Sequence, residues 1–439
     1  MRFLFINQYY SPDYAATAQQ LSDLCESLAQ LGHDVHVLTS RALYDGRDIK
    51  LKAYEVINGV HVHRIGLSTN KRERIRQRFQ GYLSFYLKAF AKIHVLPRPD
   101  VVVTLTTPPL ISLLGTWLRV VRRARFVCWV MDVYPDIAIA AGVLHRLGLA
   151  RGIWSALGRV SYMTANSLVV LGTDMKGVIA RKNVSENKIH VIQSWACGNE
   201  VFRVPDQQNS FRASHLNDAE FTLMYSGNMG TCHTFNEVID GIRSLKDEKN
   251  IHFSFVGGGK QLSHLKENLG DLKDTVKFLP YQDRKDLRMS LSAPNAHLIT
   301  LQSRYDGLLV PSKLYAIMAA GRPAIFVGGE NNEVARILRE AECGIIVPEG
   351  DSQGFVKAVR QLRDDPAAAE RMGQNGRNHF ERHFDRKIGV RRFAEMLERE
   401  ALQPGVRGVR HLAHRSLSLM PNSHGAEAQP SRSGRMSET

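Results

Sequence analysis

The feature that most constrains this chain is an alternation of short apolar runs with longer amphipathic segments, which occurs in two separate series. Residues 3–7 form an apolar run that suits a buried strand, and residues 16–30 carry Leu21, Leu24 and Leu28 at helical spacing. Strands that alternate with helices form parallel sheets covered by helices on both faces. The sequence therefore predicts an α/β protein with two doubly wound, Rossmann-like domains that face a cleft.

Both series contain elements of ordinary length, and a polar stretch without periodicity at 195–217 is expected to link the two domains. The first series predicts strands at 3–7, 35–39, 60–65, 101–104, 126–130, 168–171 and 190–193, and helices at 16–30, 79–95, 110–121, 150–163 and 173–182. The second predicts strands at 221–225, 251–256, 276–279, 297–300, 324–327 and 344–347, and helices at 234–246, 260–269, 283–292, 312–320, 331–341, 353–363, 366–382 and 387–402. We assign 1–198 to the first domain, 199–402 to the second, and 403–439 to a disordered basic tail.

Cysteine spacing and hydropathy exclude several classes of protein. The five cysteines are odd in number, lie far apart and lack metal-ligand spacing, so we expect reduced thiols, no metal site and no cofactor. The opening MRFLFINQYY lacks the long apolar core of a signal peptide. No stretch offers the run of about 18 apolar residues that would span a membrane. These features favour a cytoplasmic protein.

Positive charge is concentrated in the first half of the chain. The net charge is +15, of which residues 1–198 carry +12. The basic residues fall in two clusters beside apolar sequence, namely Arg72, Arg74, Arg76 and Arg78 within the run 71–78, and Arg119, Arg122, Arg123 and Arg125. Such clusters suit an anionic membrane surface, and a solvated face over an ordinary core helix explains them equally well. Nucleic acid is not expected as a partner, because no helix-turn-helix, zinc or RNP-type motif accompanies the charge.

Residues 310–328, which read VPSKLYAIMAAGRPAIFVG, predict a short helix followed by a buried strand. Ser312, Lys313 and Leu314 begin the helix, Gly321 ends it, and Arg322 suits its negative end. Backbone N–H groups, a hydroxyl and an ammonium therefore converge at one helix N-terminus, an arrangement that holds phosphate groups. An ordinary capped helix with a solvated Lys313 is the alternative.

Three further turns follow predicted strands of the second domain and carry residues suited to close contact with a ligand: Gly227, Asn228 and Gly230 in the first, Gly257 and Gly258 in the second, and Tyr281 in the third. Glycine lets the backbone approach a phosphate or sugar, and a planar base could lie against the third turn. One such turn alone indicates little, because tight turns need glycine for steric reasons. Several turns at one edge of a parallel sheet favour a ligand site.

Carboxylates follow predicted strands in both domains. Asp132 comes after the strand at 126–130 and could accept a hydrogen bond from a substrate hydroxyl, although a helix or turn cap explains it equally well. Glu330 and Glu333 follow the strand at 324–327, where one of them could contact a sugar or cap a helix N-terminus. The residue types therefore leave both a binding and a structural role open.

The motifs YSGNMG, FVGGGK, FLPY, VPSKLYAIMAAGRP and GIIVPEGD, with the opening INQYYSPDYAAT, resemble the GT-B glycosyltransferases of family 4. The branch that the chain resembles most is the colanic-acid and O-antigen type, the WbuB-like group, and the resemblance runs from residue 1 to about 400. It implies a GT-B fold that binds a nucleotide-sugar donor in the second domain and an acceptor mainly in the first. In such enzymes the final helix, here around 387–402, usually crosses back to the first domain.

The resemblance also implies roles for single residues. The expected donor site comprises Gly227, Asn228, Gly230, Gly257, Gly258, Tyr281, Ser312, Lys313, Leu314 and Glu330, with Lys313 and Asp132 as the candidate catalytic residues. Many relatives carry a Glu-x7-Glu motif whose carboxylates contact the sugar and the ribose. In this chain those positions are Leu308 and Ala316, so the identity of the sugar stays open.

These observations predict a retaining glycosyltransferase that moves a sugar from a nucleotide-sugar, with a UDP-sugar favoured, to a lipid-linked saccharide in O-antigen, capsule or exopolysaccharide biosynthesis. Retention is implied by the resemblance and fits the lack of an obvious nucleophile and base pair. A nucleotide-sugar epimerase of the same fold and a catalytically silent partner that binds nucleotide-sugar or membrane are the alternatives. The expected location is the inner face of the cell membrane, where the basic first domain binds peripherally.

Overall fold

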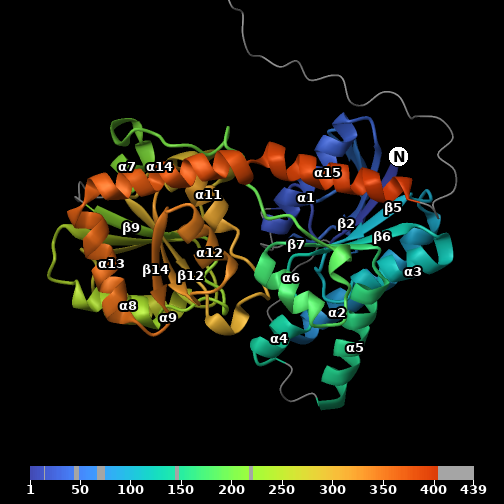
Figure 1. Ribbon diagram of the computed structural model, residues 1–439, viewed down its shortest axis with the longest axis horizontal. Coiled ribbons are helices and arrows are strands. Elements are labelled where there is room, and N and C mark those ends of the chain that lie inside the picture. The colour runs from blue at the N-terminus through green and yellow to red at the C-terminus, as the bar shows by residue number, and fades with distance from the viewer. Residues whose placement is uncertain (14, 44–48, 67–74, 144–147, 217–220, 404–439) are drawn as a thin grey trace, which may run out of the picture.

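The computed structural model describes residues 1–403 apart from residue 14 and the segments 44–48, 67–74, 144–147 and 217–220. Two sequence predictions therefore fall outside the described residues. These are the basic tail, apart from Gln403, and the basic run at 71–78, of which the backbone from 75 onward is described. The described chain forms two α/β units, each built on its own sheet, and the last helix lies along the first unit (Figure 1).

An eight-stranded sheet forms the first unit, and its strands are apolar because helices cover both faces. Its strands are β1 (Arg2–Ile6), β2 (Asp34–Ser40), β3 (Tyr54–Ile57), β4 (Val60–Ile65), β5 (Val101–Thr104), β6 (Arg125–Val130), β7 (Ser167–Val170) and β8 (Ile189–Val191). In the order β3-β4-β2-β1-β5-β6-β7-β8, all neighbours are parallel except β3 and β4. The sequence did not predict β3, an edge strand on which Tyr54 and Val56 are exposed.

The first unit has helices on both faces of its sheet. They are α1 (Ala16–Gln30), α2 (Ile75–Val95), α3 (Ser112–Arg122), α4 (Asp136–Ala140), α5 (Gly148–Thr164) and α6 (Thr173–Ala180), with the 3-10 turn η1 (Glu186–Lys188). α1 lies above the sheet in Figure 1, and α2, α3 and α5 lie below it. The helix α4 has only five residues, is too short to show helical periodicity and begins at Asp136, whose side chain makes no capping hydrogen bond.

The second unit is a six-stranded, fully parallel sheet in the order β11-β10-β9-β12-β13-β14. Its strands are β9 (Phe221–Ser226), β10 (Ile251–Val256), β11 (Val276–Leu279), β12 (Ala296–Thr300), β13 (Ala324–Gly328) and β14 (Gly344–Pro348). Its helices are α8 (Asn236–Ser244), α9 (Leu262–Leu269), α10 (Leu287–Ser292), α11 (Lys313–Ala319), α12 (Glu333–Glu340), α13 (Ser352–Asp364) and α14 (Pro366–His383), with η3 (Arg284–Asp286) and η4 (Ser303–Tyr305). The strand order brings the ends of β9, β10 and β11 together at one edge.

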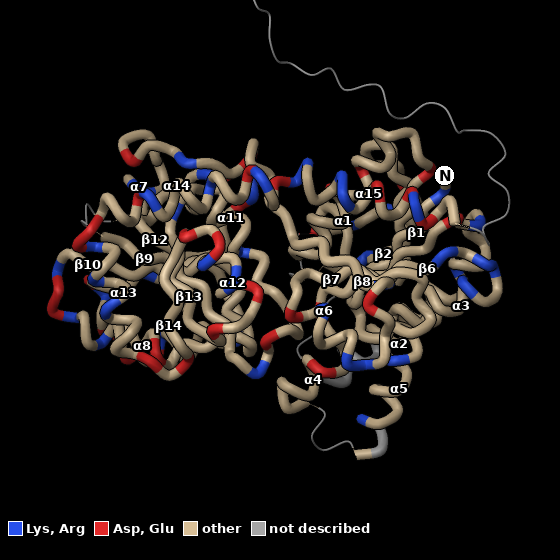
Figure 2. Tube along the Cα trace, viewed as in Figure 1, with Lys and Arg blue, Asp and Glu red and all other residues tan. Residues whose placement is uncertain are grey.

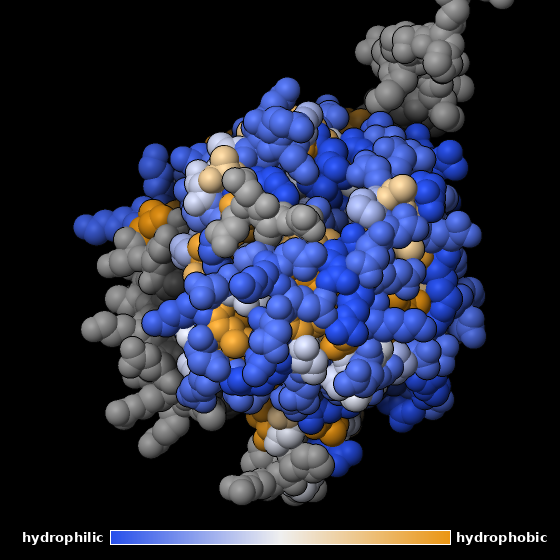
Figure 3. Space-filling view, turned by 90° about the vertical axis from the view of Figure 1, so that its left-hand side faces the viewer, coloured by the Kyte–Doolittle hydropathy of each residue, from blue (hydrophilic) through white to orange (hydrophobic). Residues whose placement is uncertain are grey.

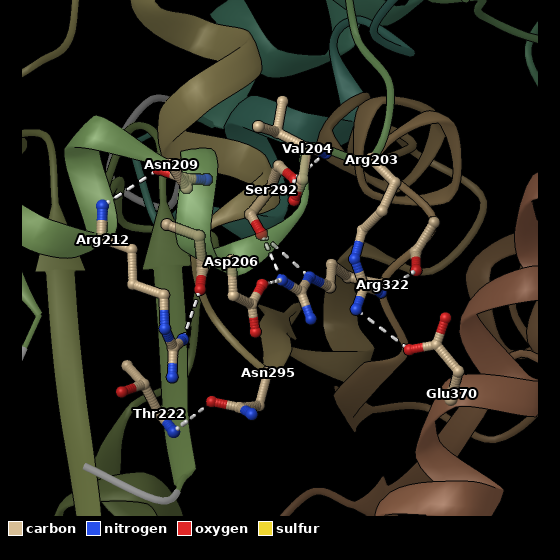
Figure 4. Close-up of polar contacts among 12 residues, drawn as sticks. Arg203, Val204, Asp206, Asn209, Arg212, Thr222, Ser292, Asn295, Arg322 and Glu370 are labelled. Carbon is tan, nitrogen blue, oxygen red and sulfur yellow. Dashed lines mark hydrogen bonds and ion pairs between the residues drawn. The ribbon is translucent and has the colours of Figure 1, made fainter. Parts of the chain in front are cut away.

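The stretch expected to be a linker is folded onto the second unit. It contains η2 (Asp206–Gln208) and α7 (Ser210–His215), which Asn209 caps by accepting a hydrogen bond from the Arg212 N–H at 3.0 Å. The Val204 N–H donates to Ser292 Oγ at 2.6 Å (Figure 4). Short elements held by tertiary contacts leave no periodic signal, so the sequence showed only a polar, irregular stretch.

Arg322 connects this segment to the rest of the second unit, and its contacts show that one prediction was wrong. Its guanidinium donates to the Ser292 carbonyl at 2.9 Å and to Asp206 Oδ1 at 2.6 Å (Figure 4). Arg322 therefore interacts with the carboxyl end of α10, and the expectation that it serves the end of its own helix was wrong. At the end of α11, Arg377 donates to the Ala319 carbonyl at 2.6 Å instead.

The last helix, α15 (Arg386–Leu402), packs on the first unit although it follows the helices of the second. The Phe393 ring lies 4.6 Å from the ring of Trp129, centroid to centroid, and the Arg125 Nε donates to Glu400 at 2.9 Å. Trp129 and Phe393 are both buried, so α15 completes the hydrophobic core of the first unit.

Candidate functional site

The ends of β9 and β10 form two interlocked turns. Gly227 and Gly257 have φ values of +130° and +127°, a region that other residues rarely adopt. A Cβ on Gly257 would lie 2.2 Å from the Gly227 carbonyl oxygen, so only glycine allows the turns to pack this closely. The Gly227 N–H donates to the Val256 carbonyl at 2.9 Å and the Met229 N–H to the Gly258 carbonyl at 2.7 Å. These contacts fix the path of the backbone at the sheet edge.

The remaining predicted residues of the turns lie at the same edge. Asn228 is exposed and Gly230 is partly exposed, while the Asn228 carbonyl accepts a 2.8 Å hydrogen bond from the Tyr225 hydroxyl. The Tyr281 ring lies against the second turn, since Cβ atoms on Gly257 and Gly258 would approach it to 3.3 and 3.2 Å. Tyr281 is 59% exposed and presents an aromatic face beside this backbone.

Lys313, the first residue of α11, places its ammonium in the middle of this edge. Its Nζ lies 3.5 Å from the centroid of the Tyr225 ring, and a Cβ on Gly227 would come within 3.6 Å of it. The Nζ atom is buried and has no hydrogen-bond partner among the described residues. Desolvation lowers the pKa of Lys313 to about 7. Among the described residues, the buried ammonium has only an aromatic face beside it and no hydrogen-bond acceptor. An anionic ligand would supply the missing acceptor.

The other predicted donor residues differ in what they present. Ser312 is the N-cap of α11 and is partly exposed, without a side-chain capping bond. The Leu314 side chain is fully buried in the core, so this residue can offer a ligand only its backbone. Glu330 has an exposed side chain, and its carbonyl accepts a hydrogen bond from Arg339. None of these positions is tested by a bound ligand, and their roles stay predictions.

Asp132 follows β6 on the opposite side of the site. Its N–H donates to Thr106 Oγ1 at 3.1 Å, and the Met131 N–H donates to the same oxygen at 3.2 Å. The Asp132 carboxylate caps no described helix or turn by a hydrogen bond. Desolvation raises the pKa of Asp132 to about 6, so the carboxylate is surrounded mainly by protein.

The two units meet where these residues lie. The Val133 N–H, next to Asp132, donates to the carbonyl of Leu308 in the second unit at 2.9 Å. Cys232 lies close enough to both Asp132 and Lys313 for each charge to act on the pKa of its thiol, which desolvation raises to about 11. A candidate acceptor-side carboxylate and a candidate donor-side ammonium therefore share one site.

Sequence reasoning missed three contributors to this site. Tyr225 lies under Lys313, and Cys232 lies between the charged groups. The Nδ1–H of His233 donates a hydrogen bond to the Thr300 carbonyl at 2.6 Å, and burial together with the nearby Lys313 lowers the pKa of His233 to about 3. Tyr225 could have been identified as a candidate site residue, because it is the first residue of the YSGNMG motif. Nothing in the sequence indicates that Cys232 faces Asp132, because that contact depends on how the two units meet.

The site combines an aromatic ring, a buried cation, two glycine turns without side chains and a carboxylate from the first unit. Among the residues that the structure describes, no group of three or more His, Cys, Asp or Glu side chains is placed to hold a metal ion. This chemistry suits a phosphate-bearing ligand with a hydroxyl-bearing partner.

Comparison with known families assigns both halves of the chain. Residues 206–379 match the family described as Glycosyl transferases group 1. Residues 16–195 match the family described as Glycosyl transferase 4-like domain. The two matches cover the two sheets in turn, and they contain Lys313 and Asp132 respectively.

Individual proteins agree with these families. The chain is 28% identical over 323 residues to the glycosyltransferase WbjE of Pseudomonas aeruginosa, covering 73% of this chain and 78% of WbjE. It is 24% identical to WcaI of Escherichia coli K12, which is named for colanic acid biosynthesis, covering 90% and 98% of the two chains. Among solved structures, Anabaena HepE in complex with UDP-glucose matches with a TM-score of 0.66 and 14% identity, covering 91% of this chain and 100% of HepE.

Proposed function

This chain belongs to the GT-B glycosyltransferases of family 4 that build polysaccharides, and we propose that it is a retaining enzyme that transfers a sugar from a UDP-sugar to a lipid-linked saccharide. The observation that carries the donor part is the buried ammonium of Lys313, which lacks a hydrogen-bond partner among the described residues. A diphosphate supplies such a partner. UDP is favoured over GDP because HepE, which shares the fold, binds UDP and UDP-glucose.

In this proposal each group has a separate task. Lys313 stabilises the negative charge that develops on the leaving diphosphate as the bond to the sugar breaks. The turns at Gly227 and Gly257 offer backbone to the donor, and Tyr281 offers a ring face to the base. Asp132 accepts a hydrogen bond from the acceptor hydroxyl and orients it. The donor phosphate then accepts the proton of that hydroxyl, which gives retention without a second protein base.

The two positions at which many relatives carry the Glu-x7-Glu carboxylates are consistent with these roles. Leu308 uses its carbonyl to contact Val133, and Ala316 lies within α11. Neither can hold the sugar or ribose as a glutamate would. Recognition of the sugar is then left to other groups at the site, such as Asn228 and the backbone.

A lipid-linked acceptor requires the first unit to reach a membrane. Of the 18 exposed large hydrophobic residues among those described, 11 lie on three helices of the first unit: Leu83, Leu87, Phe90 and Val95 on α2, Trp117, Val120 and Val121 on α3, and Ile153, Leu157, Val160 and Met163 on α5. Two of these helices touch directly, since the rings of Phe90 and Trp117 lie 5.3 Å apart. Lys and Arg positions cluster around α3 (Figure 2). Within the described part of the chain, no helix is long and apolar enough to cross a membrane.

Among the described residues of the second unit, Tyr281 is the one exposed large hydrophobic side chain. The face in Figure 3 belongs to this unit and is predominantly hydrophilic, with apolar residues scattered singly. Basic and apolar side chains together bind anionic bilayers through attraction and shallow insertion. We therefore place the protein at the inner face of the cell membrane, with the α2–α3–α5 surface toward the lipid.

The test is a donor and acceptor screen. The purified chain is incubated with UDP- and GDP-sugars and a polyprenyl-diphosphate saccharide in vesicles, and the lipid products are analysed by mass spectrometry. We expect one glycosylated lipid, formed from a UDP-sugar. Free epimerised sugar without glycosylated lipid would identify an epimerase. Binding of nucleotide-sugar without any product would identify a silent partner.

A further inference from the structure

A shallow, open depression of about 410 Å³, called the cavity below, lies on the flank of the first unit, between α2 and the carboxyl ends of β2 and β4. Its charged lining is entirely cationic and consists of Arg41, Arg64, Lys88 and Lys92. The site described above uses none of these residues.

Three of these cations have no counter-charge among the residues that the structure describes. Arg64 pairs with Glu55 and donates to the Ser11 carbonyl at 2.7 Å, so its charge is already compensated. Arg41, Lys88 and Lys92 form no ion pair with any residue that the structure describes, and the Arg41 Nε is buried without a hydrogen-bond partner there. Like charges gathered without an anion repel each other. The cavity is therefore complementary to a ligand with more than one negative charge.

Helix α2 carries both this basic wall and an apolar stripe. At 3.6 residues per turn, Leu83, Leu87 and Phe90 lie along one line of the helix, whereas Lys88 lies roughly 130° and Lys92 roughly 170° around the helix from that line. The three apolar residues of the line are exposed. Ala91 and Val95, which also line the cavity, lie between the two lysines and the apolar line. A ligand in the cavity would have an apolar surface beside its charged group, as a lipid with a charged headgroup requires.

We propose that this cavity binds the diphosphate of an isoprenoid-linked acceptor, with the lipid chain directed along Leu83, Leu87 and Phe90. This rests on the proposed function, because it assigns part of the acceptor to a site on the first unit. Three cations that form no ion pair with a described residue match a diphosphate better than the single charge of a phospholipid phosphodiester. β4 and β6 are four strand spacings apart in the sheet, so the cavity and Asp132 lie roughly 19 Å apart at the same edge. That separation leaves room for the saccharide between the diphosphate and the reacting hydroxyl.

Vesicle binding of the full chain tests the proposal without turnover. One set of phosphatidylcholine vesicles contains polyprenyl diphosphate, and a second contains phosphatidylglycerol at the same surface potential. The variant K88Q/K92Q removes two charges from the cavity. The control R123Q/R151Q removes two exposed charges from α3 and α5, outside the cavity. R41Q is a second cavity variant, and melting curves verify that all variants are folded.

We expect K88Q/K92Q to weaken binding to the polyprenyl-diphosphate vesicles about tenfold or more, and the control to weaken it much less. For phosphatidylglycerol vesicles, both double variants should lose a similar amount of binding affinity. Two results would overturn the proposal in favour of a general basic surface. In the first, K88Q/K92Q and the control lose the same amount of affinity for the diphosphate vesicles. In the second, K88Q/K92Q loses the same amount of affinity for both kinds of vesicle. Inorganic pyrophosphate that binds the cavity variant and the parent chain equally would also overturn it. If no sugar transfer is found but the vesicle result holds, the proposed function fails and the diphosphate site stands.

Discussion

Glu333 and Asp174 cap each other's helices across the boundary between the two units. The Glu333 carboxylate accepts hydrogen bonds from the N–H and hydroxyl of Thr173, at 3.0 and 3.1 Å, at the start of α6. The Asp174 carboxylate accepts a 3.1 Å hydrogen bond from the N–H of Glu333, at the start of α12. Each carboxylate also faces the positive end of the other unit's helix. The pair therefore links the two units by three hydrogen bonds.

Removing both charges while keeping the side-chain shapes should loosen the arrangement. The variant E333Q/D174N loses two charge–dipole interactions, each worth about 1 kcal/mol in a partly buried setting. We expect a larger radius of gyration by small-angle X-ray scattering without donor, and a donor KM raised roughly tenfold. E340Q, on the same helix but paired only with Arg336 at the surface, is the control. Unchanged scattering would show that the two caps do not hold the units together.

Lys313 should matter most for turnover. K313A removes the cation that faces the leaving diphosphate, and we expect kcat to fall about 10²-fold or more with the fold intact. S312A should cost less, because the backbone at the helix start remains. K260A changes an exposed lysine in the neighbouring glycine turn and should leave kcat nearly unchanged. A folded K313A enzyme with near-normal kcat would return the stretch 310–328 to a purely structural role.

The pH dependence follows from two displaced pKa values. Donor binding needs the ammonium of Lys313, whose pKa is lowered to about 7, so kcat/KM should fall as pH rises through 7. Acceptor orientation needs the ionised Asp132, whose pKa is raised to about 6, so kcat/KM should fall as pH drops through 6. A profile from pH 5 to 9 should peak between these values, and D132N should lose the acidic limb. A flat profile over this range would contradict both roles.

The stereochemistry of the product distinguishes the proposed retaining mechanism from an inverting mechanism. If the donor phosphate accepts the proton, the new bond keeps the anomeric configuration of the donor, and D132N should retain part of its activity. Proton NMR of the early product measures the configuration directly. An inverted product, together with complete loss of activity in D132N, would make Asp132 the general base instead.

Gly257 tests whether the interlocked turns position the donor site. G257A places a Cβ 2.2 Å from the Gly227 carbonyl oxygen at a φ of +127°, so the first turn must move. We expect weaker UDP binding by calorimetry and a Tm lowered by several degrees, for a cost of about 1–3 kcal/mol. G32A, at a φ of +83° with open space around it, should lower Tm slightly and leave UDP binding unchanged.

Elements with strong local signals could be predicted closely from the sequence. α1 spans Ala16–Gln30 as predicted, because its leucines recur at helical spacing and Gly32 follows with a positive φ of 83°. β4, β10 and β11 also have their predicted bounds, since each is a short segment with apolar residues at alternate positions between turns. α7 was missed because its six residues depend on Asn209 and on packing against α10.

The candidate site was harder to predict than the fold. The motif at 310–328 places Lys313 at a helix start, and the structure agrees. The surroundings of the Lys313 ammonium depend on the order of the strands, which cannot be read from the sequence. The sequence therefore could not show that this ammonium lacks a hydrogen-bond partner among the described residues or that the Tyr225 ring lies beneath it. Glu333 was considered as a sugar contact or a cap for its own helix. It instead caps a helix of the other unit, a contact between residues 160 positions apart.

The packing of α15 on the first unit bears on the order in which the chain folds as it is made. Translation produces β1 to β8 first, yet Phe393 reaches Trp129 only after almost all of the described chain has been synthesised. Until then the apolar surface around Trp129 lacks its native cover. The nascent first half therefore resembles an intermediate with exposed hydrophobic surface, the kind of species that chaperones bind. A stop codon before α15 would leave that surface uncovered permanently, even though both sheets would be complete.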